Sequence, residues 1–194
     1  MRSLKALIAL VAALALAGAG AAYAQSSKKP PAKFGKPIAE ADIAAWDIDI
    51  RTPDGKGLPA GKGSVAEGKE IYAAKCLPCH GADGKAGEQV GALFGGIGSF
   101  KTNARVLTPG SMYPYAAILF DYTRRAMPMT APQSLGANDV YALSAYLLFL
   151  NGLVKEDAVM DAKSLAAVPM PNRDGFIPDD RPDTKATRCM KDCM

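Results

Sequence analysis

The chain has 194 residues, 49% of them hydrophobic, and a formal net charge of +4 at pH 7. This length and composition fit one compact domain with extensions rather than several domains. Loss of Arg2 and Lys5 with the leader described next lowers the charge from +4 to +2. Such a small charge gives no electrostatic reason to expect binding to nucleic acid or to anionic membranes.

Residues 1–24 have the pattern of a signal peptide. Two basic residues precede an Ala/Leu-rich stretch, and Ala22-Tyr23-Ala24 matches the A-x-A cleavage pattern. We expect cleavage after Ala24 and a mature chain in the bacterial periplasm. The alternative is an uncleaved anchor, because the apolar stretch approaches the roughly 20 residues needed to span a bilayer. No later segment is long enough, so we expect no stable membrane span after cleavage.

Residues 25–59 are predicted to form a leader and a packing arm. The stretch 25–31 is polar and proline-rich, which is typical of disorder. A short helix is expected within 37–46, because a proline lies near its start and acidic residues occupy its first turn. Its apolar anchors are Ile38, Ile43 and Trp46, and Trp46 is expected to fix the arm by packing.

The main domain is expected over residues 60–154 and begins with a helix that ends near Lys75. Ser64 and Glu67 form the S-x-x-E capping box at the start of this helix. Small and apolar residues then recur at spacings of three and four, up to Cys76. These residues are Val65, Gly68 and Tyr72.

The motif Cys76-Leu77-Pro78-Cys79-His80 follows, and its C-x-x-C-H spacing is the attachment signature of a c-type haem. Cys76 and Cys79 are predicted to bond the porphyrin, and His80 to be the proximal iron ligand. The alternatives are a dithiol redox pair or half of a zinc site. Zinc fits poorly, because His80 is the only histidine and the other cysteines lie more than a hundred residues away. A dithiol site normally follows a strand, whereas a helix is predicted here.

Three further elements are predicted in the main domain. The glycine-rich stretch 81–98 is expected to bend against a flat cofactor, with Leu93, Phe94 and Ile97 as contacts. A second helix is predicted over 115–125, entered through a proline. A last helix is predicted from about 138 to 151, with an acidic start and a glycine stop.

The sixth iron ligand cannot be a second histidine, so a methionine sulfur is the strongest candidate. Met127 lies in a loop between two predicted helices, and the proline after it stiffens the position. A thioether ligand raises the reduction potential and fills the position where a substrate would bind. Met129, Met112 and an open site remain as alternatives.

Residues 155–194 are expected to form an extended C-terminal tail, because they contain prolines and few periodic apolar residues. Cys189 and Cys193 lie four residues apart near its end. No histidine follows them, so they cannot form a second haem site of the same type. A small disulfide loop is the simplest interpretation for an exported chain. Bonds to a partner and thiol chemistry on sulfur species are the alternatives.

Together these motifs resemble the class I c-type cytochromes. The resemblance rests on Gly68 and Tyr72 in the first helix, the attachment motif, the Met127-Pro128 loop, and Leu143 and Tyr146 in the final helix. It implies an all-α fold in which helices pack around one covalently bound haem c with its iron. The N-terminal arm and the C-terminal tail would extend from this small domain.

Longer stretches resemble the cytochrome subunit of sulfane dehydrogenase from the bacterial sulfur-oxidising (Sox) system. They are FGKPIAEADIAAWDIDIRTPDGKGLPAGKG, YPYAAILFDYTRRAMPMTAPQSL and VPMPNRDGF. The resemblance implies a molybdenum-cofactor dehydrogenase subunit as partner, which oxidises the sulfur substrate and passes electrons to the haem. A downstream cytochrome or oxidase would then receive them. No catalytic residue for sulfur oxidation is expected in this chain.

The sequence departs from these families in two respects. Many class I cytochromes have a proline whose carbonyl orients the proximal histidine, whereas the comparable stretch here is Val90-Gly91-Ala92. The sulfane dehydrogenase subunit can carry a second haem domain, whereas this chain has a single C-x-x-C-H motif. The partner can therefore be a sulfane dehydrogenase, a related sulfite dehydrogenase or another enzyme.

The sequence thus favours a periplasmic monohaem cytochrome that takes single electrons from such a dehydrogenase and passes them to the respiratory chain. In that case the chain is the electron-transfer subunit of an oxidoreductase, and substrate chemistry belongs to another subunit. Two alternatives remain. One is a free electron shuttle for other dehydrogenases, and the other is a haem enzyme or sensor with an open sixth coordination position.

Overall fold

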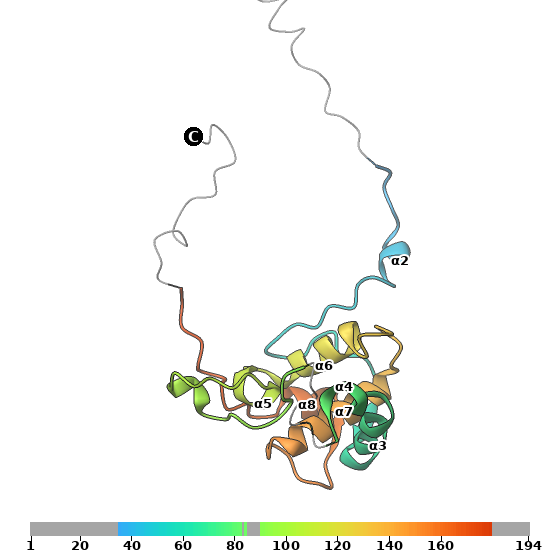
Figure 1. Ribbon diagram of the computed structural model, residues 1–194. Coiled ribbons are helices and arrows are strands. Elements are labelled where there is room, and N and C mark those ends of the chain that lie inside the picture. The colour runs from blue at the N-terminus through green and yellow to red at the C-terminus, as the bar shows by residue number, and fades with distance from the viewer. Residues whose placement is uncertain (1–34, 83, 85–89, 180–194) are drawn as a thin grey trace, which may run out of the picture. The chain divides into compact units, whose positions relative to one another are not determined.

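The computed structural model describes residues 35–82, 84 and 90–179 (Figure 1). The predicted signal peptide, the polar stretch 25–31 and the pair Cys189 and Cys193 lie outside the described residues. The chain divides into two units at Trp46 and Asp47, and each is described by itself.

The first unit contains one short helix, α2 (Glu40–Ile43), within the stretch where a helix was expected. The backbone N–H of Ala39 donates to the Asp42 carboxylate over 3.1 Å, which fixes the first turn. Ile38, Ile43 and Trp46 are all exposed, and Trp46 is 83% exposed. The packing of Trp46 against the main domain stays a prediction, because the two units are described separately.

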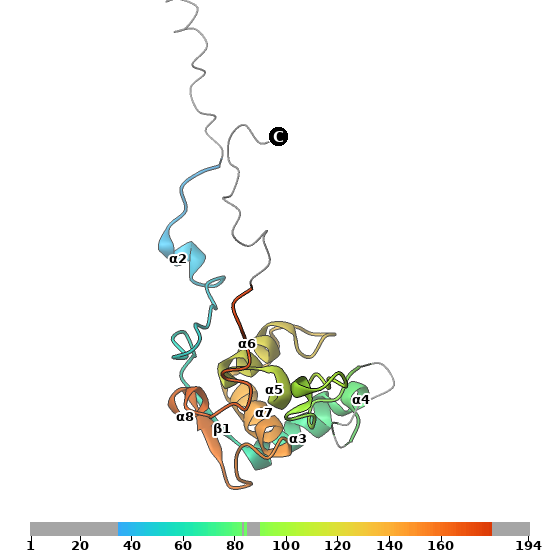
Figure 2. The same cartoon turned by 90° about the vertical axis from the view of Figure 1, so that its left-hand side faces the viewer.

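The second unit is built on the crossing of α3 (Val65–Lys75) and α7 (Ala137–Leu150) (Figure 2). A Cβ atom on Gly68 would collide with the backbone carbonyl of Ala142, so only glycine lets the two helices approach this closely. One turn further along, the rings of Tyr72 and Tyr146 lie 5.4 Å apart. This distance is in the favourable range for an aromatic pair.

The start of α3 is set by the predicted capping box. The backbone N–H of Ser64 donates to the Glu67 carboxylate over 2.7 Å, and the backbone N–H of Glu67 donates to the Ser64 hydroxyl over 3.2 Å. Both bonds satisfy donors that a helix start leaves free. The helix ends at Lys75, as predicted from the sequence.

A second layer comes from residues that were expected to be an extended tail. Strand β1 (Lys62–Ser64) pairs antiparallel with β2 (Val159–Asp161), and α8 (Ala162–Ala166) follows. These elements and the residues just after α8 bury four apolar side chains in the core: Met160, Leu165, Val168 and Met170. The tail therefore differs from the expectation over this part of its length. Elements of three to five residues are too short to show a hydrophobic period.

The remaining helices complete the all-α fold predicted for the domain. They are α4 (Leu77–His80), the 3₁₀ helix η1 (Ser99–Lys101), α5 (Pro109–Met112) and α6 (Ala116–Ala126). Helix α7 ends at Leu150, and the expected glycine stop, Gly152, follows the capping residue Asn151 with a φ of +70°. Within the described residues, none of the helices is both long and apolar enough to cross a bilayer.

Candidate haem-binding site

The end of α3 leads directly into the attachment motif. Cys76 caps this helix, and its N–H donates to the carbonyl of Tyr72 over 2.8 Å. Helix α4 then forms a single turn, in which the N–H of His80 donates to the Cys76 carbonyl over 2.9 Å. The Tyr72 hydroxyl donates to the Gly81 carbonyl over 2.9 Å and ties the end of this turn back to α3. The two thiols and the imidazole thus come from one turn of backbone.

The two cysteines differ in exposure, since Cys76 is half-buried and Cys79 is exposed. Burial raises the pKa of Cys76 to about 11, while Lys75 opposes this shift and Cys79 adds slightly to it. The Cys76 thiol is therefore protonated at neutral pH. A catalytic dithiol has a thiol whose pKa is lowered, so this environment does not fit one. Among the described residues, no group of three or more His, Cys, Asp or Glu is placed to hold a metal ion by itself.

The imidazole of His80 has a lowered pKa and one ring nitrogen without a hydrogen-bond partner among the described residues. Burial lowers its pKa, and the backbone of Gly91 opposes part of that shift without making a hydrogen bond to Nδ1. The Nδ1 atom is buried and has no hydrogen-bond partner among the described residues. An unsatisfied buried nitrogen costs about 1–3 kcal/mol and is uncommon in proteins. A neutral imidazole with unmet bonding capacity fits a residue that coordinates iron.

His80 and Met127 line the same cavity, although 47 positions separate them in the sequence. The cavity is mostly apolar, and an apolar wall suits a porphyrin. Met112 lines it as well, whereas Met129 is 72% exposed and is absent from its wall. The other lining residues are Val90, Gly91, Ala92, Leu93, Leu107, Thr108, Pro109, Tyr113, Leu119, Tyr122, Thr123 and Leu147.

Sequence reasoning identified only part of this wall. Of the three loop residues expected to contact the cofactor, Leu93 lines the cavity, whereas Phe94 does not and Ile97 is 47% exposed. The wall formed by α5, α6 and α7 was missed. Their apolar stripes are visible in the sequence, but a stripe does not show whether a given residue faces the core or the cofactor.

Asn151 fixes the loop that forms one side of the cavity. Its Nδ2 atom donates to the carbonyls of Leu93 and Leu147 over 3.0 and 2.8 Å. Its Oδ1 atom accepts from the N–H of Gly95 over 3.2 Å, and the Thr108 hydroxyl donates to the Gly95 carbonyl over 2.7 Å. From the sequence, Asn151 was identified only as the end of a helix. The contacts of Asn151 with Leu93 and Gly95 span more than 50 positions, so no local pattern indicates them.

Replacing Asn151 with alanine is expected to destabilise the protein by about 2–4 kcal/mol. The change leaves the carbonyl of Leu93 and the N–H of Gly95 without their hydrogen-bond partner, and both groups are partly buried. Each such group costs about 1–3 kcal/mol when unpaired. Thermal unfolding of the haem-loaded protein measures the loss. Asn103→Ala is the matched control, because Asn103 is exposed. Equal stability of the two variants would contradict the role given to Asn151.

Two comparisons with known proteins give positive matches. The family model described as cytochrome C oxidase, cbb3-type, subunit III matches residues 63–147. A chain in the crystal structure of the sulfane dehydrogenase SoxCD from Paracoccus pantotrophus is 38% identical, with a TM-score of 0.72. The match covers 86% of this chain and 83% of that one. The search of curated proteins found no match. With this match, this fold and this attachment motif, the chain belongs to the c-type cytochromes, electron-transfer proteins with a covalently bound haem c and its iron.

Proposed function

We propose that this chain is a periplasmic monohaem cytochrome in which Cys76 and Cys79 tether the haem and His80 and Met127 ligate its iron. The observation that carries the proposal is that His80 and Met127 line one cavity, next to the turn that bears both thiols. When bound, the haem supplies an iron centre that takes up and releases one electron at a time.

The protein's own contribution is to hold and shield that centre. The apolar side chains of the cavity wall exclude water. Without water to solvate charge, the site favours the oxidation state of the iron centre that carries less charge. Met127 would occupy the position open to a substrate, so the site passes electrons rather than binding small molecules. This property distinguishes the proposed carrier from a haem enzyme or sensor.

We further propose a molybdenum-containing sulfane or sulfite dehydrogenase as the electron donor, and a cytochrome or oxidase as the acceptor. The similarity to a chain of SoxCD supports the donor. Two cavity-lining residues, Leu107 and Tyr122, are also 62% and 52% exposed. They offer apolar surface beside the site for a partner. The predicted signal peptide supports the periplasmic location.

The test is to recover the tagged mature protein from its native periplasm, identify what co-purifies, and add sulfur compounds one at a time. A molybdenum protein at fixed stoichiometry is expected, together with reduction of the haem by a sulfur compound. A His80→Ala variant is the control for electron transfer through this site. If no sulfur compound reduces the haem and no molybdenum is recovered, the donor assignment fails and a free shuttle remains.

A further inference from the structure

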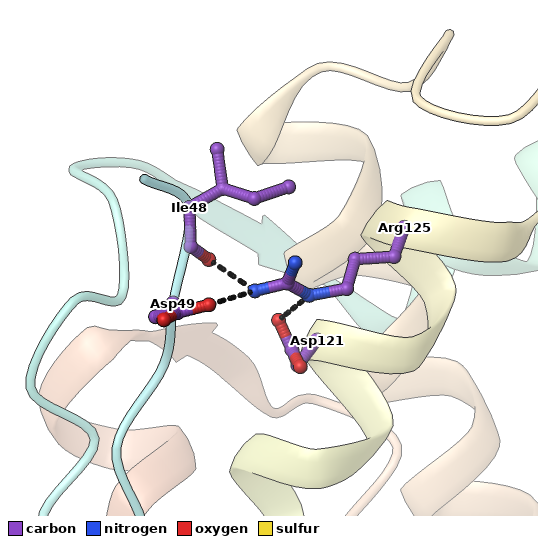
Figure 3. Close-up of polar contacts among 4 residues, drawn as sticks. All are labelled: Ile48, Asp49, Asp121 and Arg125. Atoms are coloured by element: carbon purple, nitrogen blue, oxygen red, sulfur yellow. Dashed lines mark hydrogen bonds and ion pairs between the residues drawn. The ribbon is translucent and has the colours of Figure 1, made fainter. Parts of the chain in front are cut away.

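Arg125 joins the end of α6 to a segment that lies more than 70 positions earlier in the chain (Figure 3). Its Nη2 atom donates to the Ile48 carbonyl and to the Asp49 carboxylate, each over 2.9 Å. Its Nε atom donates to Asp121, one turn back on the same helix, over 2.8 Å. The guanidinium group is therefore held on two sides at once, which its planar shape allows.

The segment that receives these bonds, residues 47–59, is here named the arm base. It is itself anchored to the core. Ile50 and Leu58 pack against the core, and the Tyr141 hydroxyl donates to the carbonyl of Pro59 over 2.8 Å. A Cβ atom on Gly57 would collide with the Asp49 carbonyl, which shows how closely the loop folds on itself. The arm base thus connects α6 to α7 by a route that does not pass through the cavity.

Met127 is the residue directly after α6 and caps its C-terminal end. Its N–H donates to the carbonyl of Thr123 over 3.1 Å, which is the last backbone bond of the helix. Helix ends fray easily, because their terminal groups lack helical partners. Arg125 lies in this same last turn, two positions before Met127. A bond that fixes Arg125 therefore also limits the movement of the residue proposed to reach the iron.

We propose that Arg125 is a positioning residue for Met127, holding the start of the ligand loop against the arm base. The inference rests on the proposed function, because Met127 must be the distal ligand. Exposed ion pairs add little to stability, and the side chain of Asp49 is 87% exposed. The contribution of Arg125 is therefore expected in the geometry of the ligand loop more than in global stability.

The test compares Arg125→Ala with Arg124→Ala in the haem-loaded protein. Both variants lose one positive charge at neighbouring positions, so the long-range effect of charge on the iron is matched. The side chain of Arg124 makes no hydrogen bond or ion pair within the part of the chain that the structure describes. The first readout is the equilibrium binding of imidazole to the ferric iron, which displaces a weakly held methionine. The second is hydrogen exchange at the Met127 amide, which reports opening of the last turn.

Arg125→Ala is expected to bind imidazole about tenfold more tightly than wild type and to exchange the Met127 amide about tenfold faster, equivalent to about 1.4 kcal/mol. Arg124→Ala should stay within about twofold of wild type in both. Arg125→Lys keeps the charge but not the paired geometry, so it should fall between the two alanine variants. Asp49→Ala should reproduce part of the effect and add little to Arg125→Ala, because both remove the same bond.

Equal behaviour of the two alanine variants would overturn the inference. If Arg125→Ala does not fold, the lysine and Asp49 variants decide, and wild-type values in both would overturn it. The wild-type spectrum separates this result from failure of the proposed function. A ferric protein without a methionine–iron band refutes Met127 as the ligand before any arginine variant is compared. In that case the inference about Arg125 is refuted together with the assignment of Met127.

Discussion

Replacement of Met127 by alanine is expected to abolish the methionine–iron charge-transfer band of the ferric protein and to lower its reduction potential. Loss of a thioether removes the ligand that favours ferrous iron. The fall should be on the order of 0.1–0.3 V, since axial ligands set potentials over about 0.8 V. Ferric absorption spectra and a potentiometric titration measure the two effects.

Two other methionines serve as controls for this experiment. Met129→Ala should leave the band and the potential unchanged, because Met129 is 72% exposed and lies outside the cavity wall. Met112→Ala is the stricter control, because Met112 lines the same cavity. It should keep the band and change only packing. If Met112→Ala loses the band and Met127→Ala keeps it, the assignment of the distal ligand moves to Met112.

The parts of the fold that the sequence predicts are those with local signals. The capping box of Ser64 and Glu67 lies within one turn, and the structure places the start of α3 directly after it. The glycine stop of α7 and the proline entry to α6 are equally local. Each of these signals depends on backbone groups only a few residues away, so they are readable without knowledge of the tertiary structure.

The parts that could not be predicted depend on distant contacts. Met160 and Leu165 are core residues only because β2 pairs with β1, far away in the sequence. The position of Arg125 in the last turn of α6 indicates only a charge that suits a helix end, whereas its bonds lead to Ile48 and Asp49. Tertiary contacts decide which residues are buried in the core and which distant groups a side chain bonds to. A single sequence does not show these contacts.

Distant contacts also join the segments before α3 and after α7 to the helical core of the small domain. The core is covered on one side by β2 and α8, which come from after α7, and the arm base before α3 is tied to α6. Arg173 adds a contact of the same kind, with its guanidinium carbon 4.2 Å from the centre of the Tyr115 ring. Tyr115 is the residue that caps α6. Chain segments on both sides of the helical domain therefore restrain the helix that leads to Met127.

The second large effect is expected at Gly68, where α3 and α7 cross. Alanine is a better helix former than glycine by about 1 kcal/mol, so propensity alone predicts that Gly68→Ala stabilises the protein. The added Cβ atom would collide with the Ala142 carbonyl and lie 2.8 Å from the Cβ atom of Tyr146. Neither group can move without shifting α7. Overpacking of a core commonly costs about 1–3 kcal/mol, and here the obstacle is backbone, so we expect a net loss of about 2 kcal/mol or more.

The loss should reach the haem site as well, because α3 carries Cys76 at its end. We expect Gly68→Ala to lower both the midpoint of denaturant unfolding and the yield of covalently attached haem. Ala74→Val on the exposed face of the same helix is the control, because it adds methyl groups where no helix packs. It should cost only the small helix propensity of valine, less than about 1 kcal/mol. If Gly68→Ala is instead the more stable protein, propensity outweighs the steric term and the two helices do not cross as closely as the structure places them.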